Sequence, residues 1–353
     1  MKLEQILSAL IFIALGCVNL VAAQNKPDEA LFPVYSNGKY GYINQKGVLV
    51  VKPQFDRAGY FCEGMAAVVV EGKQGFINAA GELAIKPQFV PTPMRYCFSE
   101  GLAAVNFSTS IMGQYGYIDK TGKVVIPAQF ISNSPFSEGL VDVIEGSGFG
   151  AHTAYYDRTG RHVLDFENIG GSFSGGVAGA FLHGKYVIID RTGKVISTPP
   201  VDHFSNFSEG LARAEVKGKI GFINQKGDIA IAPQFDKAPL DTIVSPNVVH
   251  QFSEGLAPVI IGGKRGFIDR TGKVVIAPTF DEADSFSEGL ARVKNNRRWG
   301  YIDKKGTVVI PLQFENAAPF EHGLAEVIPF GTANWLSWSY IDKTGKYVWK
   351  PEK

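Results

Sequence analysis

Apolar and polar residues alternate over short segments that are separated by glycine, proline and acidic residues. Residues 290–293 (Leu-Ala-Arg-Val) show the period of two that is typical of a half-buried strand. Further strands are predicted at residues 299–303 and 307–310. The sequence Asp-Lys-Lys-Gly at 303–306 is typical of a tight hairpin turn, in which glycine adopts a positive φ. The pattern therefore predicts an antiparallel meander of three strands.

The same meander recurs along the chain. Six clear copies and three degenerate ones contain Gly-aromatic-Ile-Asp/Asn, two further residues and a turn glycine, in units of about 34 residues with some insertions. The turn glycines are Gly47, Gly81, Gly122, Gly160, Gly193, Gly227, Gly272, Gly306 and Gly345. One such meander has too little core to fold alone, so neighbouring units must bury its apolar face. Residues 31–353 are therefore predicted to form one all-β repeat array.

The unit resembles a known bacterial repeat. Its phrases Gly-Leu-Ala-x-Val, Gly-Lys-x-Gly-Tyr-Ile-Asp and Thr-Gly-Lys-Val-Val-Ile-Pro, followed by phenylalanine, are similar to the WG repeat, also called the KWG repeat. The tryptophan that names this family stands only at Trp299, while Gln74, Tyr115, Ile220 and Arg265 take its place in other units. The resemblance implies a β-rich scaffold of roughly three strands per unit, with no agreed activity.

Nine units can be arranged in two ways. Three strands per unit and nine copies favour an open superhelical array that resembles a solenoid. A closed β-propeller is the alternative, because the unit is about the size of a propeller blade, although a blade needs four strands and nine copies exceed the usual number. We expect the open array, with atypical units at its ends.

The N-terminus has the form of a secretory signal. A lysine and an apolar run within residues 2–21 are followed by small residues and then by a polar segment, which predicts cleavage after Ala23. Residues 1–23 are therefore the expected signal peptide and residues 24–30 a short linker. Export to the periplasm or the medium follows, and a lipoprotein anchored at Cys17 is a minor alternative.

Composition narrows the classes of partner. Lysine and arginine (35) balance aspartate and glutamate (34), and they are interspersed, so the chain lacks the basic stripe that nucleic-acid binding needs. After the signal, no stretch approaches the roughly 20 apolar residues of a membrane helix. We expect neither a nucleic-acid partner nor a membrane span in the mature chain, and we expect a monomer.

Two cysteines, Cys62 and Cys97, remain after the predicted cleavage and lie in consecutive units. In an oxidising compartment they are candidates for a disulfide. Their offsets from the repeat glycines Gly64 and Gly101 differ by two residues, so a pair of free thiols is the other interpretation.

Acidic residues recur at two fixed places in the unit, and repetition argues for structural roles. Asp or Asn at the hairpin turn is expected to cap its own backbone, and the glutamate of Phe-Ser-Glu-Gly to accept hydrogen bonds from turn amides. The turn residues are Asn44, Asn78, Asp119, Asp157, Asp190, Asn224, Asp269, Asp303 and Asp342; the glutamates are Glu63, Glu100, Glu138, Glu209, Glu254 and Glu288. A catalytic residue is needed once rather than six times, so none is assigned.

Signatures of metal, cofactor or nucleophile chemistry are not found. The histidines (His152, His162, His183, His203, His250 and His322) show neither the i, i+4 spacing nor the cysteine partners of a zinc site and are expected at the surface. Nucleophile elbow, P-loop and dinucleotide fingerprint are missing from the sequence. We therefore expect no enzyme, metal or cofactor. The alternative is a cell-envelope hydrolase with its site in the degenerate region 144–183, where the acids are Glu145, Asp157 and Asp165.

Three units lengthen the same connection, between residues 105–116, 143–154 and 327–339, so these loops should project from one edge of the array. Loops on a rigid scaffold often carry recognition. The candidate ligand contacts in the last loop are Phe330, Asn334, Trp335 and Trp338, which could stack on a sugar or on a partner's side chains. Capping of the core is the other interpretation. We predict an exported, non-enzymatic scaffold that binds a protein, peptide or envelope glycan through its loops and the face of the array.

Overall fold

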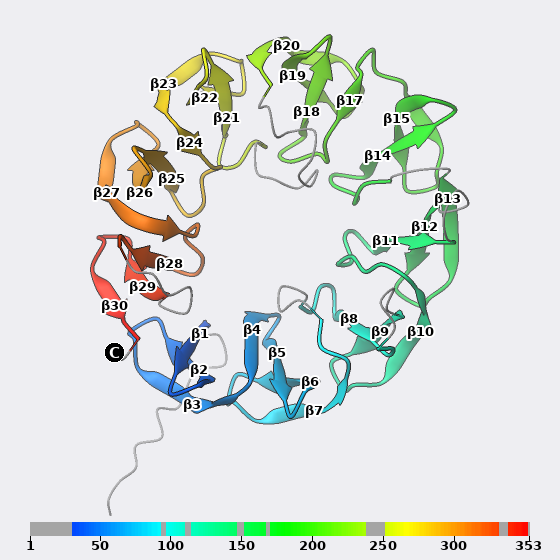
Figure 1. Cartoon of the computed structure of the whole chain (residues 1–353). Coiled ribbons are helices and arrows are strands. Elements are labelled where there is room, and N and C mark those ends of the chain that lie inside the picture. Colours follow the sequence, from blue (N-terminus) through cyan, green and yellow to red (C-terminus); the bar gives the residue numbers. More distant parts are fainter. Residues whose placement is uncertain are drawn as a thin grey trace, which may run out of the picture.

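The computed structural model describes residues 30–92, 97–109, 114–146, 152–166, 170–237, 251–331 and 338–351. In this part of the chain every regular element is a β-strand, and no helix is long and apolar enough to cross a membrane. The strands form nine successive units around a ring, with the last strand of each unit at the outer rim (Figure 1). The predicted all-β repeat architecture is confirmed.

The strands of each unit follow one another in the chain. Units 1 to 5 contain β1 (Leu31–Ser36), β2 (Lys39–Asn44) and β3 (Leu49–Phe55); β4 (Arg57–Cys62), β5 (Met65–Val70), β6 (Lys73–Asn78) and β7 (Leu83–Phe89); β8 (Leu102–Asn106), β9 (Tyr115–Asp119) and β10 (Val124–Phe130); β11 (Leu140–Glu145), β12 (His152–Asp157) and β13 (His162–Phe166); β14 (Val177–Leu182), β15 (Lys185–Asp190) and β16 (Val195–Ser197). Units 6 to 9 contain β17 (His203–Phe204), β18 (Leu211–Val216), β19 (Lys219–Asn224) and β20 (Ile229–Asp236); β21 (Leu256–Ile261), β22 (Lys264–Asp269) and β23 (Val274–Phe280); β24 (Glu282–Ala283), β25 (Leu290–Asn295), β26 (Arg298–Asp303) and β27 (Val308–Ala317); β28 (Leu324–Pro329), β29 (Ser339–Asp342) and β30 (Tyr347–Trp349).

Each unit is an antiparallel meander, as the sequence predicted. In unit 8, Leu290 of β25 pairs with Asp303 of β26, and Trp299 of β26 pairs with Phe314 of β27. The pairing of β26 with β27 is irregular around Gly300, where an added Cβ would lie 2.6 Å from the carbonyl oxygen of Ile310. Only glycine fits so close to a neighbouring backbone, which explains why it recurs at this place in the unit.

A fourth strand extends three of the units at the sheet edge opposite the outer strand: the six-residue β4 and the two-residue β17 and β24. In unit 8, Ala283 of β24 pairs with Val293 of β25. The long strand β27 does the same for unit 9, because its last residue, Ala317, pairs with Val327 of β28. In these four units the segment after the outer strand of the preceding unit thus crosses over and joins the sheet. The count of three strands, on which the preference for an open array rested, is too low for these units.

Tyrosine hydroxyl groups link successive units, and the same contact closes the ring. Four of them lie 2.7–2.9 Å from a carbonyl oxygen in the next unit or in the segment leading into it: Tyr42 to Gly59, Tyr117 to Ser134, Tyr155 to Gly171 and Tyr301 to Ala318. Tyr340 of unit 9 lies 2.9 Å from the carbonyl oxygen of Pro33 in unit 1. Its ring also packs edge-on against Phe32, with 5.5 Å between the ring centroids.

A second contact repeats across this seam between units 9 and 1. Lys304 in the hairpin turn of unit 8 donates to the carbonyl oxygen of Glu254 in unit 7. Gln45, at the same place in unit 1, donates through Nε2 to the carbonyl oxygen of His322 in unit 9 at 2.6 Å. Units 9 and 1 are therefore neighbours in the same sense as any other pair.

The structure corrects the preference for an open superhelical array: the ring is closed, as in the alternative. The physical reason is burial, since an open array would leave one apolar face of each end unit in water. Closure instead packs the two faces together in one buried cluster of Phe32, Val34, Ile43, Leu324 and Tyr340.

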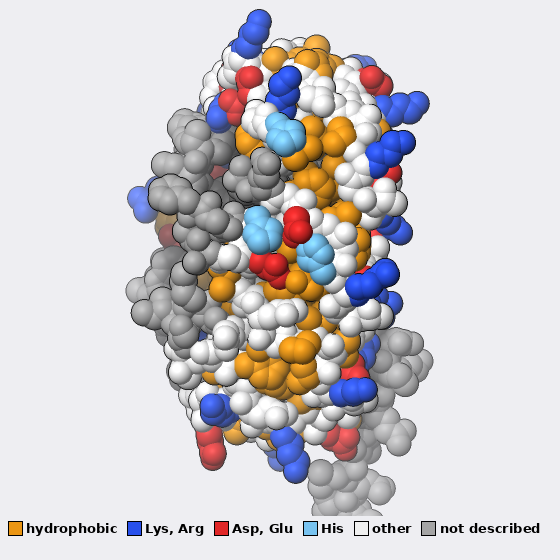
Figure 2. Space-filling view, turned by 90° about the vertical axis from the view of Figure 1, so that its right-hand side faces the viewer, with side chains coloured by type: hydrophobic (Ala, Val, Ile, Leu, Met, Phe, Trp, Pro, Cys, Tyr) orange, Lys and Arg blue, Asp and Glu red, His pale blue; other side chains and the backbone are white. Residues whose placement is uncertain are grey.

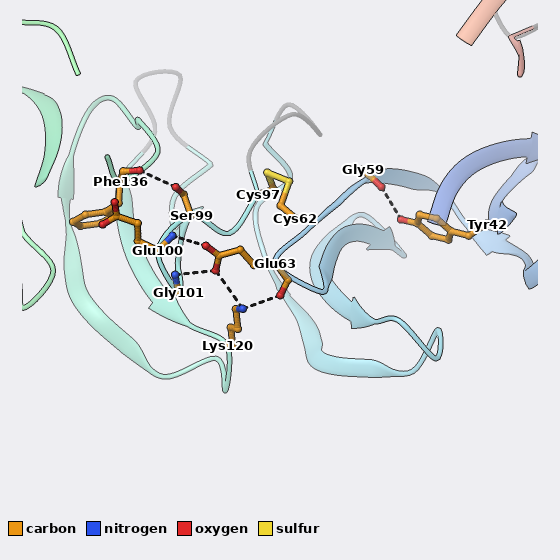
Figure 3. Close-up of a disulfide and its surroundings, with 10 residues drawn as sticks. All are labelled: Tyr42, Gly59, Cys62, Glu63, Cys97, Ser99, Glu100, Gly101, Lys120 and Phe136. Carbon is orange, nitrogen blue, oxygen red and sulfur yellow. Dashed lines mark hydrogen bonds and ion pairs between the residues drawn. A yellow bond between two sulfur atoms is a disulfide. The ribbon is translucent and has the colours of Figure 1, made fainter. Parts of the chain in front are cut away.

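The Phe-Ser-Glu-Gly turns form another link between units. Ser99 Oγ donates to the carbonyl oxygen of Phe136 at 2.7 Å, and the carboxylate of Glu63 accepts the N–H groups of Glu100 and Gly101 at 2.7 and 2.9 Å (Figure 3). The same glutamate-to-amide link to the next unit is made by Glu100, Glu138, Glu209, Glu254 and Glu288. The predicted structural role of these glutamates is confirmed.

The hairpin acids cap their own turns, also as predicted. Asp303 Oδ1 accepts the N–H groups of Thr307 and Lys305, both at 2.9 Å, and these bonds lower the pKa of Asp303 although desolvation opposes them. Gly306 completes the turn with a φ of 82°. The recurring acids at the hairpin turns therefore have a structural role.

Replacing Glu138 with glutamine should weaken the link between units 4 and 5. Its carboxylate accepts the N–H groups of Gly175 and Gly176 and pairs with Arg191 at 2.7 Å. Arg191 and then the two amides lower the pKa of Glu138, against desolvation. We expect a loss of about 1–2 kcal/mol at pH 7, because the new amide puts an NH₂ group against these donors. Urea unfolding at pH 7 measures this loss.

The pH dependence of that loss has a defined sign. A carboxyl group whose pKa is lowered in the folded protein adds stability above its unfolded pKa of about 4.3, and this stability is lost as the pH falls through the folded pKa. The two proteins should therefore converge near pH 3. Glu71→Gln, at an exposed hairpin turn, is the control, and an equal loss in both variants would contradict the link.

Candidate functional site

A cavity of about 1150 Å³ lies at the seam of the ring. Leu31 and Phe32 of unit 1 line it together with Tyr60 of unit 2, Trp299 of unit 8 and Tyr340 of unit 9. Its wall thus combines the two ends of the chain, so this seam cavity exists only because the ring closes.

Six aromatic residues line the seam cavity. They are Phe32, Tyr60, Phe61, Trp299, Trp338 and Tyr340. Aromatic side chains supply large apolar contact areas and ring faces on which a ligand can stack. The cavity is therefore suited to a ligand with apolar or flat groups.

The charged groups of the cavity hold one another in place. The guanidinium group of Arg292 donates to the carboxylate of Asp284 and to the carbonyl oxygen of Ala317, and it lies over the ring of Trp299 at 4.7 Å. Such a stacked, doubly bonded arginine is fixed in position. It keeps the Trp299 ring in one orientation at the cavity wall.

A second polar pair lies within unit 9, between neighbouring strands β28 and β29. Tyr340 Oη is 2.6 Å from Glu326 Oε1, and burial raises the pKa of Tyr340, so the tyrosine stays neutral and can donate. Counted together, the lining acids are Glu63, Asp284, Glu321 and Glu326, against one arginine. The cavity is therefore lined by more acidic than basic side chains.

The sequence of the seam departs from the repeat at His322. This residue takes the place of the glutamate in the Phe-Ser-Glu-Gly turn, and its φ of 51° matches the 53° of Glu288. An imidazole does not offer the two acceptor oxygens of a carboxylate. His322 therefore cannot make the glutamate-to-amide link, although its carbonyl oxygen still accepts the repeated bond, here from Gln45, and the residue lines the cavity.

The two cysteines are bonded in the structure, at the edge of the seam cavity. The Sγ atoms of Cys62 and Cys97 are 2.03 Å apart, and their Cα atoms are 5.6 Å apart (Figure 3). Cys62 ends β4, and Cys97 lies in the segment that leads into unit 3. Of the two interpretations of these cysteines, the structure contains the disulfide, which ties unit 2 to unit 3.

The structure separates the candidate contacts of the last loop. Trp338 lines the seam cavity. Phe330 is 46% exposed and lies away from the lining, with the guanidinium group of Arg298 over its ring at 4.3 Å. Asn334 and Trp335 lie outside the described residues. The strands that flank the three long loops form equivalent pairs: β8–β9, β11–β12 and β28–β29. This arrangement fits the prediction that the three loops project from one edge of the array.

The acids of the alternative hydrolase have different roles. Asp157 is a turn residue whose pKa is lowered to about 2, first by the Thr159 hydroxyl group and then by turn amides and Arg161. Glu145 Oε2 and Asp165 Oδ1 instead lie 3.6 and 3.5 Å from His152 Nε2. No sequence pattern joined Glu145, His152 and Asp165, because an extended loop separates Glu145 from His152.

Sequence reasoning missed most of the cavity residues, because each occupies an ordinary place in the repeat. Arg292, Glu326 and Tyr340 are strand residues that become a site only through ring closure. One signal was available: Trp299 alone keeps the tryptophan of the repeat, and it is the tryptophan beside Arg292.

A closed ring of nine antiparallel β-meander units defines a protein of the β-propeller class. The model of the WG-containing repeat matches residues 40–73, 75–107, 115–147, 188–219, 220–241, 266–298 and 299–328, more than half of the chain. The chain therefore belongs to the family of WG-repeat proteins. No curated protein matches it.

Two solved structures match the chain at low sequence identity. A eukaryotic initiation factor matches with a TM-score of 0.59 and 12% identity, over 92% of this chain and 96% of that chain. BamB from Moraxella catarrhalis matches with a TM-score of 0.47 and 11% identity, over 77% of this chain and 92% of that chain. At these identities the first likeness shows the fold alone.

Proposed function

We propose that this chain is an exported, non-enzymatic scaffold that binds a segment of another polypeptide in the seam cavity. The observation that carries the proposal is the cavity itself, with about 1150 Å³ and six aromatic side chains in its walls. This volume exceeds the roughly 300–1,000 Å³ typical of pockets for small ligands. It suits several residues of an extended chain.

Charge favours a polypeptide over an envelope glycan. Four acids and one arginine line the cavity, and the arginine is already paired with Asp284. Complementary charge sets specificity at interfaces. A peptide with basic and aromatic side chains fits this balance, whereas the carboxylate groups of an acidic glycan oppose it.

The test is binding of residues 24–353 to an array of synthetic decapeptides of varied charge and aromatic content, with purified peptidoglycan beside it. We expect basic, aromatic peptides to bind the wild type and to lose at least tenfold in affinity with Trp338→Ala, because that ring lines the cavity. Phe330→Ala, in the same loop but outside the lining, should bind as the wild type does.

Three outcomes oppose the proposal. If neither variant changes peptide binding, the ligand does not occupy the seam cavity. If no peptide binds, the polypeptide partner is abandoned. If peptidoglycan binds and Trp338→Ala loses it, the cavity belongs to a glycan. A thermal melt of each variant shows that folding is intact.

A further inference from the structure

Unit 4 differs from the other units at five places on one face of its sheet. His152 pairs with Glu145 across β11 and β12, and Tyr156 pairs with His162 across β12 and β13. Asp165 pairs with Ala154, two residues from His152. Because alternate residues of a strand share a face, these side chains are on the same side of the sheet.

The equivalent residues of other units carry no such chemistry. Where unit 4 has His152, the register places a basic residue: Lys39, Lys73, Lys185, Lys219, Lys264 and Arg298. Where it has His162, seven other units have an aliphatic residue and unit 9 has Tyr347; the seven are Leu49, Leu83, Val124, Val195, Ile229, Val274 and Val308. Unit 4 has thus replaced repeat residues with imidazole and carboxylate groups together.

The ligand atoms of this cluster lie close to one another. His152 Nε2 is 3.6 Å from Glu145 Oε2 and 3.5 Å from Asp165 Oδ1, and one ligand atom from each of the three residues lies within 4.8 Å of the others. Figure 2 shows pale blue imidazole and red carboxylate side chains gathered on this side of the ring. Glu145 and His152 are partly buried, and Asp165 is exposed.

These separations match a metal site better than a hydrogen-bonded cluster. Metal–ligand bonds of about 2.0–2.1 Å to nitrogen and oxygen put neighbouring ligand atoms of a tetrahedron roughly 3.3–3.4 Å apart. The two distances from His152 Nε2 are within a few tenths of an ångström of this value, but they are too long for a good hydrogen bond. We propose that Glu145, His152 and Asp165 bind one divalent transition-metal ion of the zinc class.

Two further side chains orient the ligands. Tyr156 Oη donates to Glu145 Oε1 at 2.5 Å, which leaves Oε2 directed at His152. His162 Nε2 lies 2.7 Å from Asp165 Oδ1, and its ring packs edge-on against Tyr156. Such outer partners fix first-shell ligands in known metal sites. Three protein ligands leave a fourth position for solvent.

The donor set selects the class of metal. One imidazole nitrogen with two carboxylate oxygens suits Zn²⁺, Co²⁺, Ni²⁺ or Cu²⁺, whereas Ca²⁺ and Mg²⁺ prefer sites made wholly of oxygen ligands. The two carboxylates also neutralise a divalent ion. Bound metal would join the two ends of the extended hairpin connection between β11 and β12, where most other units have a tight turn.

The experiment is equilibrium dialysis of tag-free residues 24–353 against ZnCl₂, with metal counted per chain. We expect one zinc ion per chain, a rise in the thermal midpoint of unfolding with zinc, and visible d–d absorption of a low-symmetry site after replacement by Co²⁺. His152→Ala and Asp165→Asn should each lower zinc affinity more than tenfold and abolish the rise. His162→Ala, an outer partner, should lower affinity less.

The control is His183→Gln, which alters an exposed histidine on the hairpin turn of unit 5 and should bind zinc as the wild type does. The proposal is overturned if wild type binds no zinc, if His152→Ala binds it equally well, or if CaCl₂ competes at equal concentration. Zinc binding is measured independently of peptide binding, so a negative zinc result would not contradict the proposed binding of a polypeptide in the seam cavity.

Discussion

Tyr340→Ala should lower the free energy of unfolding by about 3–5 kcal/mol, the usual cost of truncating a buried aromatic side chain. Tyr340 is 2% exposed because unit 1 covers it, through Phe32 and the carbonyl oxygen of Pro33. In an open array the same side chain would face water at the end of the last unit, and its removal would cost less than about 1 kcal/mol. Urea unfolding followed by tryptophan fluorescence measures the difference.

Tyr301→Ala is the matched control, because Tyr301 is the equivalent residue of unit 8 and is fully buried within the ring. A closed ring predicts similar losses for the two variants. A small loss for Tyr340→Ala beside a large one for Tyr301→Ala would show that units 9 and 1 do not pack together in solution. Tyr340→Phe separates the hydroxyl group from the ring and should cost about 1–2 kcal/mol.

The sequence was sufficient for the unit but not for the assembly. Alternation and the Asp-x-x-Gly turn placed the hairpin of Asp303 and Gly306 correctly, because these signals are local. Ring closure depends on the small rotation between neighbouring units, which must add up to a full circle over nine copies. The sequence of a single unit does not reveal this rotation. At the seam the Phe-Ser-Glu-Gly turn becomes Phe-Glu-His-Gly at residues 320–323, and nothing in the local sequence marks Glu321 or His322 as belonging to a closing contact.

The candidate sites show the same limit. Trp338 was identified because an aromatic residue in an extended loop departs from the repeat. Arg292 and Glu326 obey the strand pattern and were not identified, since their role arises from neighbours some 260 or more positions away, such as Leu31 in the cavity wall. The cluster of unit 4 was missed for a different reason: the spacing rules for zinc ligands assume one helix or one hairpin, whereas Glu145, His152 and Asp165 come from three strands.

Loss of the disulfide is the second large effect we expect. Cys62→Ser/Cys97→Ser should lower the free energy of unfolding by about 3–4 kcal/mol, because the bond closes a loop with a sequence separation of 35 and restricts the unfolded chain. It also tethers β4 beside the segment that enters unit 3, where Glu63 accepts its two amides. Urea unfolding of the oxidised wild type and the double variant measures this loss.

Reduction provides an independent control on that loss. A thiol reductant should lower the stability of the wild type to that of Cys62→Ser/Cys97→Ser and should leave the double variant unchanged. Residues 24–353 contain only these two cysteines, so thiol titration of the unfolded, unreduced protein counts the bond directly. Two titratable thiols, or a reductant effect in the double variant, would contradict the disulfide as the cause. If both controls hold, the bond stabilises the ring at the wall of the seam cavity, where the aromatic lining depends on the position of Tyr60 and Phe61 beside Cys62.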